Sequence, residues 1–202
     1  RYSSSAASDV YKRQVVKKLK VAIISTGDEL KQPGTELERG QIYESNSFGI
    51  SGLVNWLGHT PVRMHSVGDT IDDLREALNQ ASTECDLILT SGGVSMGEWD
   101  LVRKIMEEEG DIHFWRVKLR PGSPPLFGKW NNTPIFGLPG NPVSSHVVFR
   151  MLVAPWIRHN TLTSEPAEIM ITAKLSTKVK SSKDCLTLRS CLLYTSDAAD
   201  EE

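Results

Sequence analysis

Acidic and hydroxyl side chains directly follow three short apolar runs of the sequence, and together they could surround a cation. They are Thr26, Gly27, Asp28 and Glu29 after the first run, Gly68 and Asp69 after the second, and Glu98 and Asp100 shortly after the third. Carboxylates held close together repel one another unless a cation or a hydrogen-bond donor shares the site. Magnesium is the simplest cation for such a group, because it prefers oxygen ligands and retains some of its water. Each acid taken singly is better explained as a helix N-terminal residue or a solvated loop charge, so the prediction depends on their lying together.

Two glycine-rich turns could bind an anion. The run Ser91-Gly92-Gly93-Val94-Ser95 offers backbone N–H groups and two hydroxyls just before a predicted helix. It is neither a Walker loop nor a dinucleotide fingerprint, so alone it is a weak indication of phosphate binding. The second turn, residues 137–142 (GLPGNP), leads into another helix, with Asn141 as N-cap and Pro142 as first helical residue. Seen alone, this second turn fits a tight strand-to-helix connection equally well.

Three cations alternate along a strand predicted over residues 112–120. Arg116, Lys118 and Arg120 would share one face of that strand, because successive side chains point to opposite sides. Cations repeated every 7 Å or so along a strand repel one another unless they meet an anion. A solvated edge strand protected by charge is the alternative. The strand leads directly toward the second glycine turn, and this placement favours anion binding.

The elements that must position these residues alternate between strand and helix. Apolar, β-branched runs predict strands over residues 20–25, 61–67 and 86–90, and helical spacing predicts helices over residues 47–57, 70–81 and 98–108. This alternation indicates βαβ units and a mostly parallel sheet covered on both faces, which is a three-layer α/β/α fold. In open sheets of this kind, ligands bind beyond the carboxyl ends of the strands, where the polar residues above would lie.

The pattern changes after residue 112 to shorter strands with proline and glycine between them. Asn131-Asn132 between two apolar runs predicts a hairpin, and a helix is expected from Pro142 to about residue 157. Residues 167–175 (AEIMITAKL) alternate like an exposed sheet strand. We therefore expect an α/β domain over residues 15–160 and the truncated start of a β-rich C-terminal domain over residues 165–190.

Both ends of the chain, residues 1–14 and 191–202, lack hydrophobic periodicity and capping patterns. One possible coding sequence of residues 191–201 has a reverse complement that translates as SSAASDVYKR, which is the run at residues 4–13. Two flanks that encode opposite strands of one piece of DNA are what an adapter ligated to both ends of a fragment would produce. We therefore expect both flanks to be non-native and exclude them from fold prediction.

Charge and composition exclude several classes of function. The chain has 23 basic and 25 acidic residues, and the flanks account for the whole difference. A neutral interior argues against nucleic-acid or membrane-surface binding driven by bulk charge. No apolar run reaches the length of a membrane span. Outside the flanks, Cys85 and Cys185 show no recognisable pairing pattern, so a reducing cytoplasm is the simplest expected location.

Six sequence blocks occur in an order that is typical of one protein family. They are STGDEL (residues 25–30), PGTEL (33–37), GQIYESNS (40–47), TSGGVSMGEWD (90–100), LRPGSPPLFGK (119–129) and GLPGNPVS (137–144). Together they resemble the molybdopterin molybdenumtransferase family, which includes the E domain of gephyrin. The resemblance covers residues 15–157 and extends more weakly to residue 190.

The resemblance implies a role in molybdenum cofactor biosynthesis. Members of this family insert molybdate into adenylylated molybdopterin and release AMP, with magnesium assisting, and they act as homodimers. The resemblance also allows a molybdopterin adenylyltransferase as partner. Because the family's first two domains are absent from this sequence, we expect the chain alone to be inactive.

The expected site residues combine those that the resemblance implies with those of the strand ends, turns and cations described above. The expected catalytic residues are Glu29, Asp69, Asp100, Arg116 and Arg120, and Asp69 and Asp100 are the expected metal ligands. The expected residues for molybdopterin binding are Thr26, Gly27, Asp28, Ser91, Gly92, Gly93, Ser95, Lys118, Pro139, Gly140, Asn141, Pro142 and Ser144.

The sequence also departs from the family. Arg116 and Arg120 stand where lysines are common, which keeps the charge but favours bidentate contact. Ser123 stands where a lysine is usual, so one anion contact is weakened or comes from elsewhere. Two other functions fit part of the pattern: a molybdopterin adenylyltransferase, which shares the TSGG-type domain, and a non-enzymatic gephyrin-like scaffold that binds a partner peptide. The GLPGNP turn favours the molybdenumtransferase.

Overall fold

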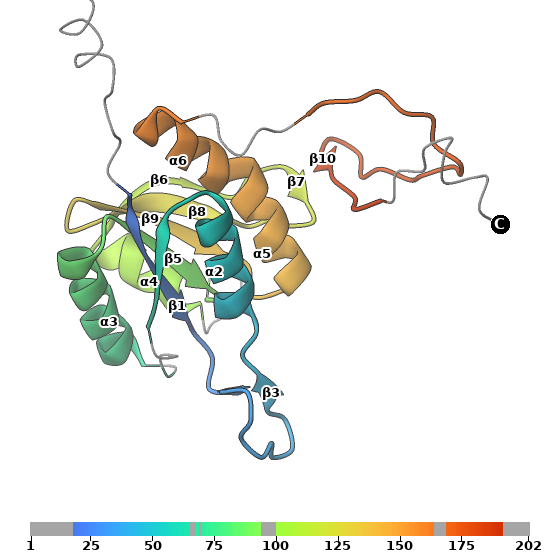
Figure 1. Cartoon of the computed structure of the whole chain (residues 1–202). Coiled ribbons are helices and arrows are strands. Elements are labelled where there is room, and N and C mark those ends of the chain that lie inside the picture. The colour runs from blue at the N-terminus through green and yellow to red at the C-terminus, as the bar shows by residue number, and fades with distance from the viewer. Residues whose placement is uncertain (1–17, 65–67, 69, 94–99, 164–168, 192–202) are drawn as a thin grey trace, which may run out of the picture.

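The computed structural model describes residues 18–64, 68, 70–93, 100–163 and 169–191. Two expected site residues, Asp69 and Ser95, lie outside these ranges, as do the first flank and all of the second except Cys191. The described ranges contain a six-stranded sheet with helices on both of its faces (Figure 1).

The sheet has the strand order β4-β1-β5-β9-β8-β6. Its strands are β1 (Lys20–Ser25), β4 (Thr60–Arg63), β5 (Leu87–Ser91), β6 (Asp111–Trp115), β8 (Leu126–Trp130) and β9 (Thr133–Leu138). Strands β4, β1, β5 and β9 pair in parallel, whereas β8 and β6 add an antiparallel edge. The apolar runs of β1 and β5 are buried because helices cover both faces of a parallel sheet. The predicted mostly parallel sheet is confirmed.

Helices form the two outer layers. Helices α3 and α4 lie on one face of the sheet, and α2 lies on the other together with one continuous helical segment made of α5, the π-helical turn η1 and α6 (Figure 1). Their bounds are α2 (Asn46–Trp56), α3 (Ile71–Glu84), α4 (Leu101–Glu108), α5 (Pro142–Val148), η1 (Phe149–Val153) and α6 (Ala154–Thr161). Alternate residues of β1 enter the two cores, Ala22 on one side and Val21 on the other. The α/β/α fold class is therefore confirmed.

The local signals for helix starts and for the hairpin are also confirmed. The side chain of Asn141 accepts a hydrogen bond from the backbone N–H of Ser144 at 3.2 Å, and Pro142 is the first residue of α5. Strands β8 and β9 form an antiparallel hairpin, with Asn131 and Asn132 at its tip at φ values of 47° and 66°. A two-residue turn with both φ values positive matches the right-handed twist of the strands, and asparagine tolerates this conformation.

The predicted strand over residues 112–120 is wrong. Strand β6 ends at Trp115, and Arg116 takes a left-handed conformation with φ 72°. Strand β7 (Leu119–Arg120) pairs instead with β10 (Leu186–Thr187), in a separate two-stranded sheet. Because the strand is broken at Arg116, the expected single face of cations does not form.

The predicted strand over residues 167–175 is wrong as well, over the part that the structure describes. Residues 169–175 have no regular structure, and Ile169 and Met170 are almost fully exposed. A segment with alternating apolar and polar residues forms a stable strand only when a neighbouring strand pairs with it. In the described part of the chain, no strand pairs with these residues. Other boundaries differ slightly: β4 begins at Thr60 and ends at Arg63, with residues 65–67 of the predicted strand outside the described ranges, and the helix predicted to end near residue 157 continues to Thr161.

A short arm extends away from the three layers (Figure 1). It is formed by strands β2 (Leu30–Lys31) and β3 (Ile42–Tyr43), which pair in parallel. Within the described ranges, no helix is long and apolar enough to cross a membrane.

Candidate functional site

Three neighbouring parallel strands end together at one edge of the sheet. Ser25 of β1 pairs with Ser91 of β5, and Ser91 pairs with Leu138 of β9. The backbone continues this contact past the strand ends, because Thr26 N–H donates to Ser91 O at 3.1 Å and Gly92 N–H donates to Leu138 O at 3.0 Å. The residues that follow the three strands are thereby brought into one place, as the sheet topology predicts.

The first glycine turn strongly favours glycine at its centre. Gly92 and Gly93 have φ values of 98° and 63°. A Cβ on Gly92 would lie 2.9 Å from the carbonyl oxygen of Thr26, and a Cβ on Gly93 would lie 3.0 Å from a methyl carbon of Val102. The Gly92 N–H is already bound to Leu138, so it serves the fold, and the other polar groups of the turn are the ones that could meet a ligand.

The second glycine turn packs against the first. A Cβ on Gly140 would meet Cα of Gly92 at 3.7 Å, so the two backbones approach closely. Asn141 caps α5, and the Ser145 hydroxyl donates back to the carbonyl of Pro139. These local bonds fix the turn that leads from β9 into the helical segment.

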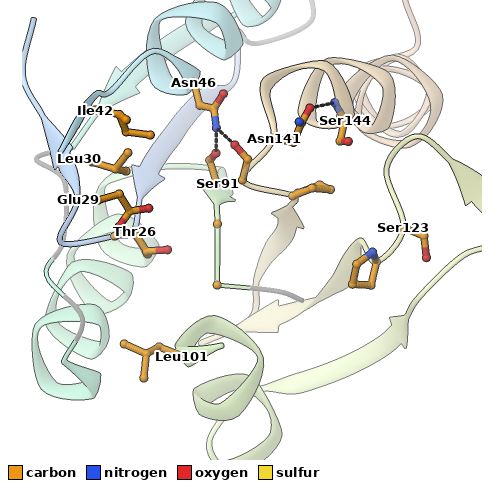
Figure 2. Close-up of a pocket in the computed structure, with 16 residues that line it drawn as sticks. Thr26, Glu29, Leu30, Ile42, Asn46, Ser91, Leu101, Ser123, Asn141 and Ser144 are labelled. Carbon is orange, nitrogen blue, oxygen red and sulfur yellow. Dashed lines mark hydrogen bonds between the residues drawn. The ribbon is translucent and has the colours of Figure 1, made fainter. Parts of the chain in front are cut away.

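Asn46, at the start of α2, joins both turns. Its side-chain amide Nδ2 donates to Ser91 Oγ at 2.6 Å and to Gly140 O at 2.7 Å. Figure 2 shows both hydrogen bonds converging on this one nitrogen. Asn46 was not among the expected site residues, because nothing local in ESNS distinguishes it from a helix-capping residue.

A cleft of about 550 Å³ opens between the two turns, the start of the β2–β3 arm and the start of α4. Ten of the residues expected at the site line it: Thr26, Gly27, Glu29, Ser91, Gly92, Gly93, Pro139, Gly140, Asn141 and Ser144. The others that line it are Leu30, Ile42, Asn46, Leu101, Ser123 and Pro124. Figure 2 shows the labelled members of both groups arranged around the same space. The structure therefore brings together the glycine turns and the end of β1.

The acids gather only in part. Glu29 lines the cleft, whereas Asp28 is exposed. Asp28 lies beside Gly68: a Cβ on Gly68 would be 3.3 Å from Asp28 Oδ1. Asp100 directly precedes α4 and does not line the cleft. In the ranges that the structure describes, no three aspartate, glutamate, histidine or cysteine side chains form a group that could hold a metal ion. Asp69, the remaining expected ligand, lies outside those ranges.

The cations lie elsewhere. Arg116, Lys118 and Arg120 do not line the cleft, and the guanidinium of Arg116 lies 4.8 Å from the ring centre of Trp115. Arg120 and Arg189 line a second, more open hollow of about 610 Å³ beside the β7–β10 pair. The expectation that one cleft joins the acids, the cations and both turns is wrong in this respect for the described residues. Pro142 also lies outside the cleft lining, as the first residue of α5.

Ser123 lines the cleft beside Pro124, on the connection between β7 and β8. A lysine at this position, as the resemblance would have it, would add a positive charge to the lining. Serine leaves a hydroxyl there, and the described lining contains no lysine or arginine. The polarity of the described lining therefore comes from neutral hydrogen-bonding groups and the single carboxylate of Glu29.

Comparisons with known proteins agree with this geometry. Residues 22–159 match the family model described as "Probable molybdopterin binding domain". A molybdopterin molybdenumtransferase of Haemophilus influenzae is 41% identical over 141 residues, which are 70% of this chain and 35% of that protein. The crystal structure of a molybdopterin biosynthesis MoeA protein from Pyrococcus horikoshii superposes with a TM-score of 0.65 at 35% identity, covering 71% of this chain and 36% of that one.

A shorter protein shares the fold. The molybdopterin biosynthesis enzyme MoaB from Thermus thermophilus superposes with a TM-score of 0.55 at 20% identity, covering 71% of this chain and 94% of that one. At this identity the likeness concerns the fold alone. The chain spans about a third of the length of the Haemophilus and Pyrococcus proteins.

Proposed function

The chain belongs to the family of probable molybdopterin-binding domains, and from this we propose that its cleft binds molybdopterin as part of a molybdopterin molybdenumtransferase. The observation that carries the proposal is the meeting of the two glycine turns with the end of β1 around one cleft. The relatives at 35% to 41% identity carry molybdopterin names, and this supports the same ligand.

The cleft suits the phosphate end of molybdopterin. The hydroxyls of Thr26, Ser91 and Ser144 and the backbone of Gly140 line it, and these groups can donate hydrogen bonds to phosphate oxygens. Donors fixed in place by the sheet lose little freedom when the ligand binds. The pterin ring would then extend toward Leu30 and Ile42, which supply apolar surface at the arm.

We propose that the whole protein binds molybdopterin in its adenylylated form, inserts molybdate into it and releases AMP. The protein contributes mainly by positioning the two reactants and by balancing their charge. Of the three expected cations only Arg120 lines the second hollow, and we propose that it contributes to holding molybdate. The chain spans about a third of the length of these relatives, so molybdate insertion is proposed for the whole protein.

The described residues do not by themselves fit magnesium, because no three possible ligands converge among them. Magnesium binding by Asp69 and Asp100 is proposed from the resemblance alone, Asp69 lies outside the described ranges, and no reaction step is assigned to the metal. Replacing Asp100 with alanine in the whole protein should abolish AMP release and leave the fold intact. Unchanged turnover would contradict a role for this carboxylate.

The assembly and location of the whole protein are proposed from the resemblance. We propose a homodimer in the cytoplasm, which receives adenylylated molybdopterin from an adenylyltransferase partner. Sedimentation of the whole protein tests the dimer, and co-purification with the adenylyltransferase tests the partner.

The alternative functions have weaker support. An adenylyltransferase is expected to share this fold, but a shared fold, such as that with the 20% identical molybdopterin biosynthesis enzyme MoaB, does not favour one activity over another. A scaffold that binds a partner peptide would need a continuous apolar groove, whereas hydroxyl residues and glycines make up half of the residues that line the cleft between the glycine turns. The molybdenumtransferase is therefore the function that the cleft and the relatives favour together.

Anaerobic titration of the chain with molybdopterin, followed by the ligand's fluorescence, tests the proposed function. We expect saturable binding at one site, and competition by inorganic phosphate because phosphate would occupy the turns. A chain with Gly140 replaced by valine serves as the control in which the approach of the two turns is blocked. Absence of saturable binding by the wild-type chain would contradict the proposal.

A further inference from the structure

Asn46 is placed to do more than start a helix. It is the first residue of α2, yet its side chain reaches two turns that lie 45 and 94 residues further along the chain. Both hydrogen bonds come from the same amide nitrogen, so the two protons of Nδ2 are divided between Ser91 and Gly140 (Figure 2). One side chain thereby sets the separation of the two turns on either side of the cleft.

The position of the Asn46 amide oxygen does not help to stabilise the fold. Its Oδ1 is buried and has no hydrogen-bond partner in the described part of the chain. A buried oxygen without a partner is unfavourable, so the amide is kept in this position against a cost. Such a cost is common where a side chain serves a binding site rather than the fold.

The bond to Ser91 also sets the direction of the serine hydroxyl. A hydroxyl has one proton to donate and lone pairs that accept. Because Ser91 Oγ accepts from Asn46, its own proton is available to donate elsewhere, and Ser91 lines the cleft. Asn46 therefore presents Ser91 as a donor to an oxyanion.

A buried carboxylate, that of Glu44, ties down the first turn of α2, in which Asn46 lies. Glu44 is only 2% exposed and accepts hydrogen bonds from Ser25 Oγ at 3.0 Å and from the backbone N–H of Ser47 at 2.7 Å. The Ser47 hydroxyl donates to its second oxygen. The first turn of α2 is thus tied to the end of β1, and Asn46 between them has little freedom to move.

We infer that Asn46 is a positioning residue for the phosphate of molybdopterin, acting by orienting Ser91 and by holding Ser91 and Gly140 at a fixed separation. The inference rests on the proposed function, because it names the part of the ligand that this end of the cleft recognises. Asn46 itself need not touch the ligand.

The test compares two ligands and two residues. Affinities for molybdopterin and for its dephosphorylated form are measured for the wild-type chain, Asn46→Leu, Ser91→Ala and the double variant. Leucine matches asparagine in shape but donates no hydrogen bond, and Asn46→Ala repeats the test should Asn46→Leu unfold. Asn55→Leu is the matched control, since Asn55 is an exposed asparagine of the same helix.

We expect Asn46→Leu to weaken molybdopterin binding about 10-fold, the loss that one or two hydrogen bonds would produce. Binding of the dephosphorylated ligand should stay within about twofold of wild type, and the double variant should lose less than the product of the two single losses. Equal weakening for both ligands, or full additivity with Ser91→Ala, would overturn the inference while leaving the proposed function in place. A wild-type chain that binds neither ligand would refute the proposed function and the inference together.

Discussion

At the scale of single residues, the site depends on backbone conformations that only glycine adopts easily. Gly92 combines a positive φ with a close contact, whereas Gly58 has a φ of 82° and open space, with nothing within 4 Å of the position that a Cβ would take. Comparing variants at these two glycines therefore separates the free-energy cost of a left-handed backbone from the cost of a steric clash.

Replacing Gly92 with alanine should lower the free energy of unfolding more than replacing Gly58. A left-handed conformation costs an L-residue about 1–2 kcal/mol, and at Gly92 the clash with the Thr26 carbonyl adds to it. Urea unfolding measures both variants, and molybdopterin binding should be lost only in Gly92→Ala. Equal unfolding curves for the two variants would contradict the close packing of the first turn.

A second prediction concerns His59, a buried histidine away from the cleft. Its Nδ1 accepts a hydrogen bond from the backbone N–H of Leu19 at 3.2 Å, and its buried Nε2 has no partner among the described residues. Burial, and secondarily the charge of Lys18, lower the pKa of His59 below its usual 6.5. The folded protein thus keeps His59 neutral at a pH where the unfolded chain binds a proton.

The free energy of unfolding should therefore fall as the pH drops below 6.5, because the unfolded state then binds more protons than the folded state. Urea unfolding between pH 7.5 and 5 at constant ionic strength, roughly the range over which histidine titrates, measures this slope. The slope should be reduced in His59→Asn and retained in His159→Asn, whose histidine is exposed on α6. An identical slope in both variants would rule out His59 as its source.

At the scale of elements, Asn79 and Ser82 of helix α3 both accept hydrogen bonds from the hairpin. Asn79 Oδ1 accepts hydrogen bonds from the indole N–H of Trp130 at 2.9 Å and from Asn131 Nδ2 at 2.9 Å. Trp130 is only 3% exposed, so its N–H has little access to water.

Asn79→Ala should destabilise the protein by about 1–3 kcal/mol, because a buried donor is left without its acceptor. Alanine also favours helix, and Asn55→Ala in α2 measures that opposing gain at a site without this contact. Thermal unfolding of the two variants gives the comparison. A rise in melting temperature for Asn79→Ala equal to that for Asn55→Ala would show that the contact contributes nothing.

The elements with local signals were predictable from the sequence, and those that depend on distant contacts were not. Strands β1 and β5 are continuous apolar runs, and the Asn131-Asn132 hairpin and the Asn141 cap carry their own turn chemistry. The break at Arg116 has no such signal, since alternation alone continues through it. Residues 169–175 alternate correctly for a strand but have no strand to pair with in the described structure.

The site shows the same division. The two glycine turns and the end of β1 could be placed together because parallel strands end at the same edge of a sheet. Asn46 could not be predicted, because its partner at Gly140 lies 94 residues away. The cations were misplaced because their expected common face depended on an unbroken strand.

At the scale of the whole molecule, the two hollows would attract an anionic ligand in different ways. The described lining of the cleft between the glycine turns has hydrogen-bonding groups and the carboxylate of Glu29 but no cation, whereas the hollow beside β7 and β10 contains Arg120 and Arg189. Long-range attraction of an anion would favour the arginines, while a fixed set of donors favours the cleft. We therefore expect molybdopterin to bind in the cleft rather than beside the arginines.

Mapping of backbone amide shifts by nuclear magnetic resonance during anaerobic addition of molybdopterin tests this assignment most directly. We predict that the largest shifts occur at Thr26, Gly93, Gly140 and Asn141, which line the cleft. Largest shifts at Arg120, Leu188 and Arg189, with the glycine turns unchanged, would contradict it.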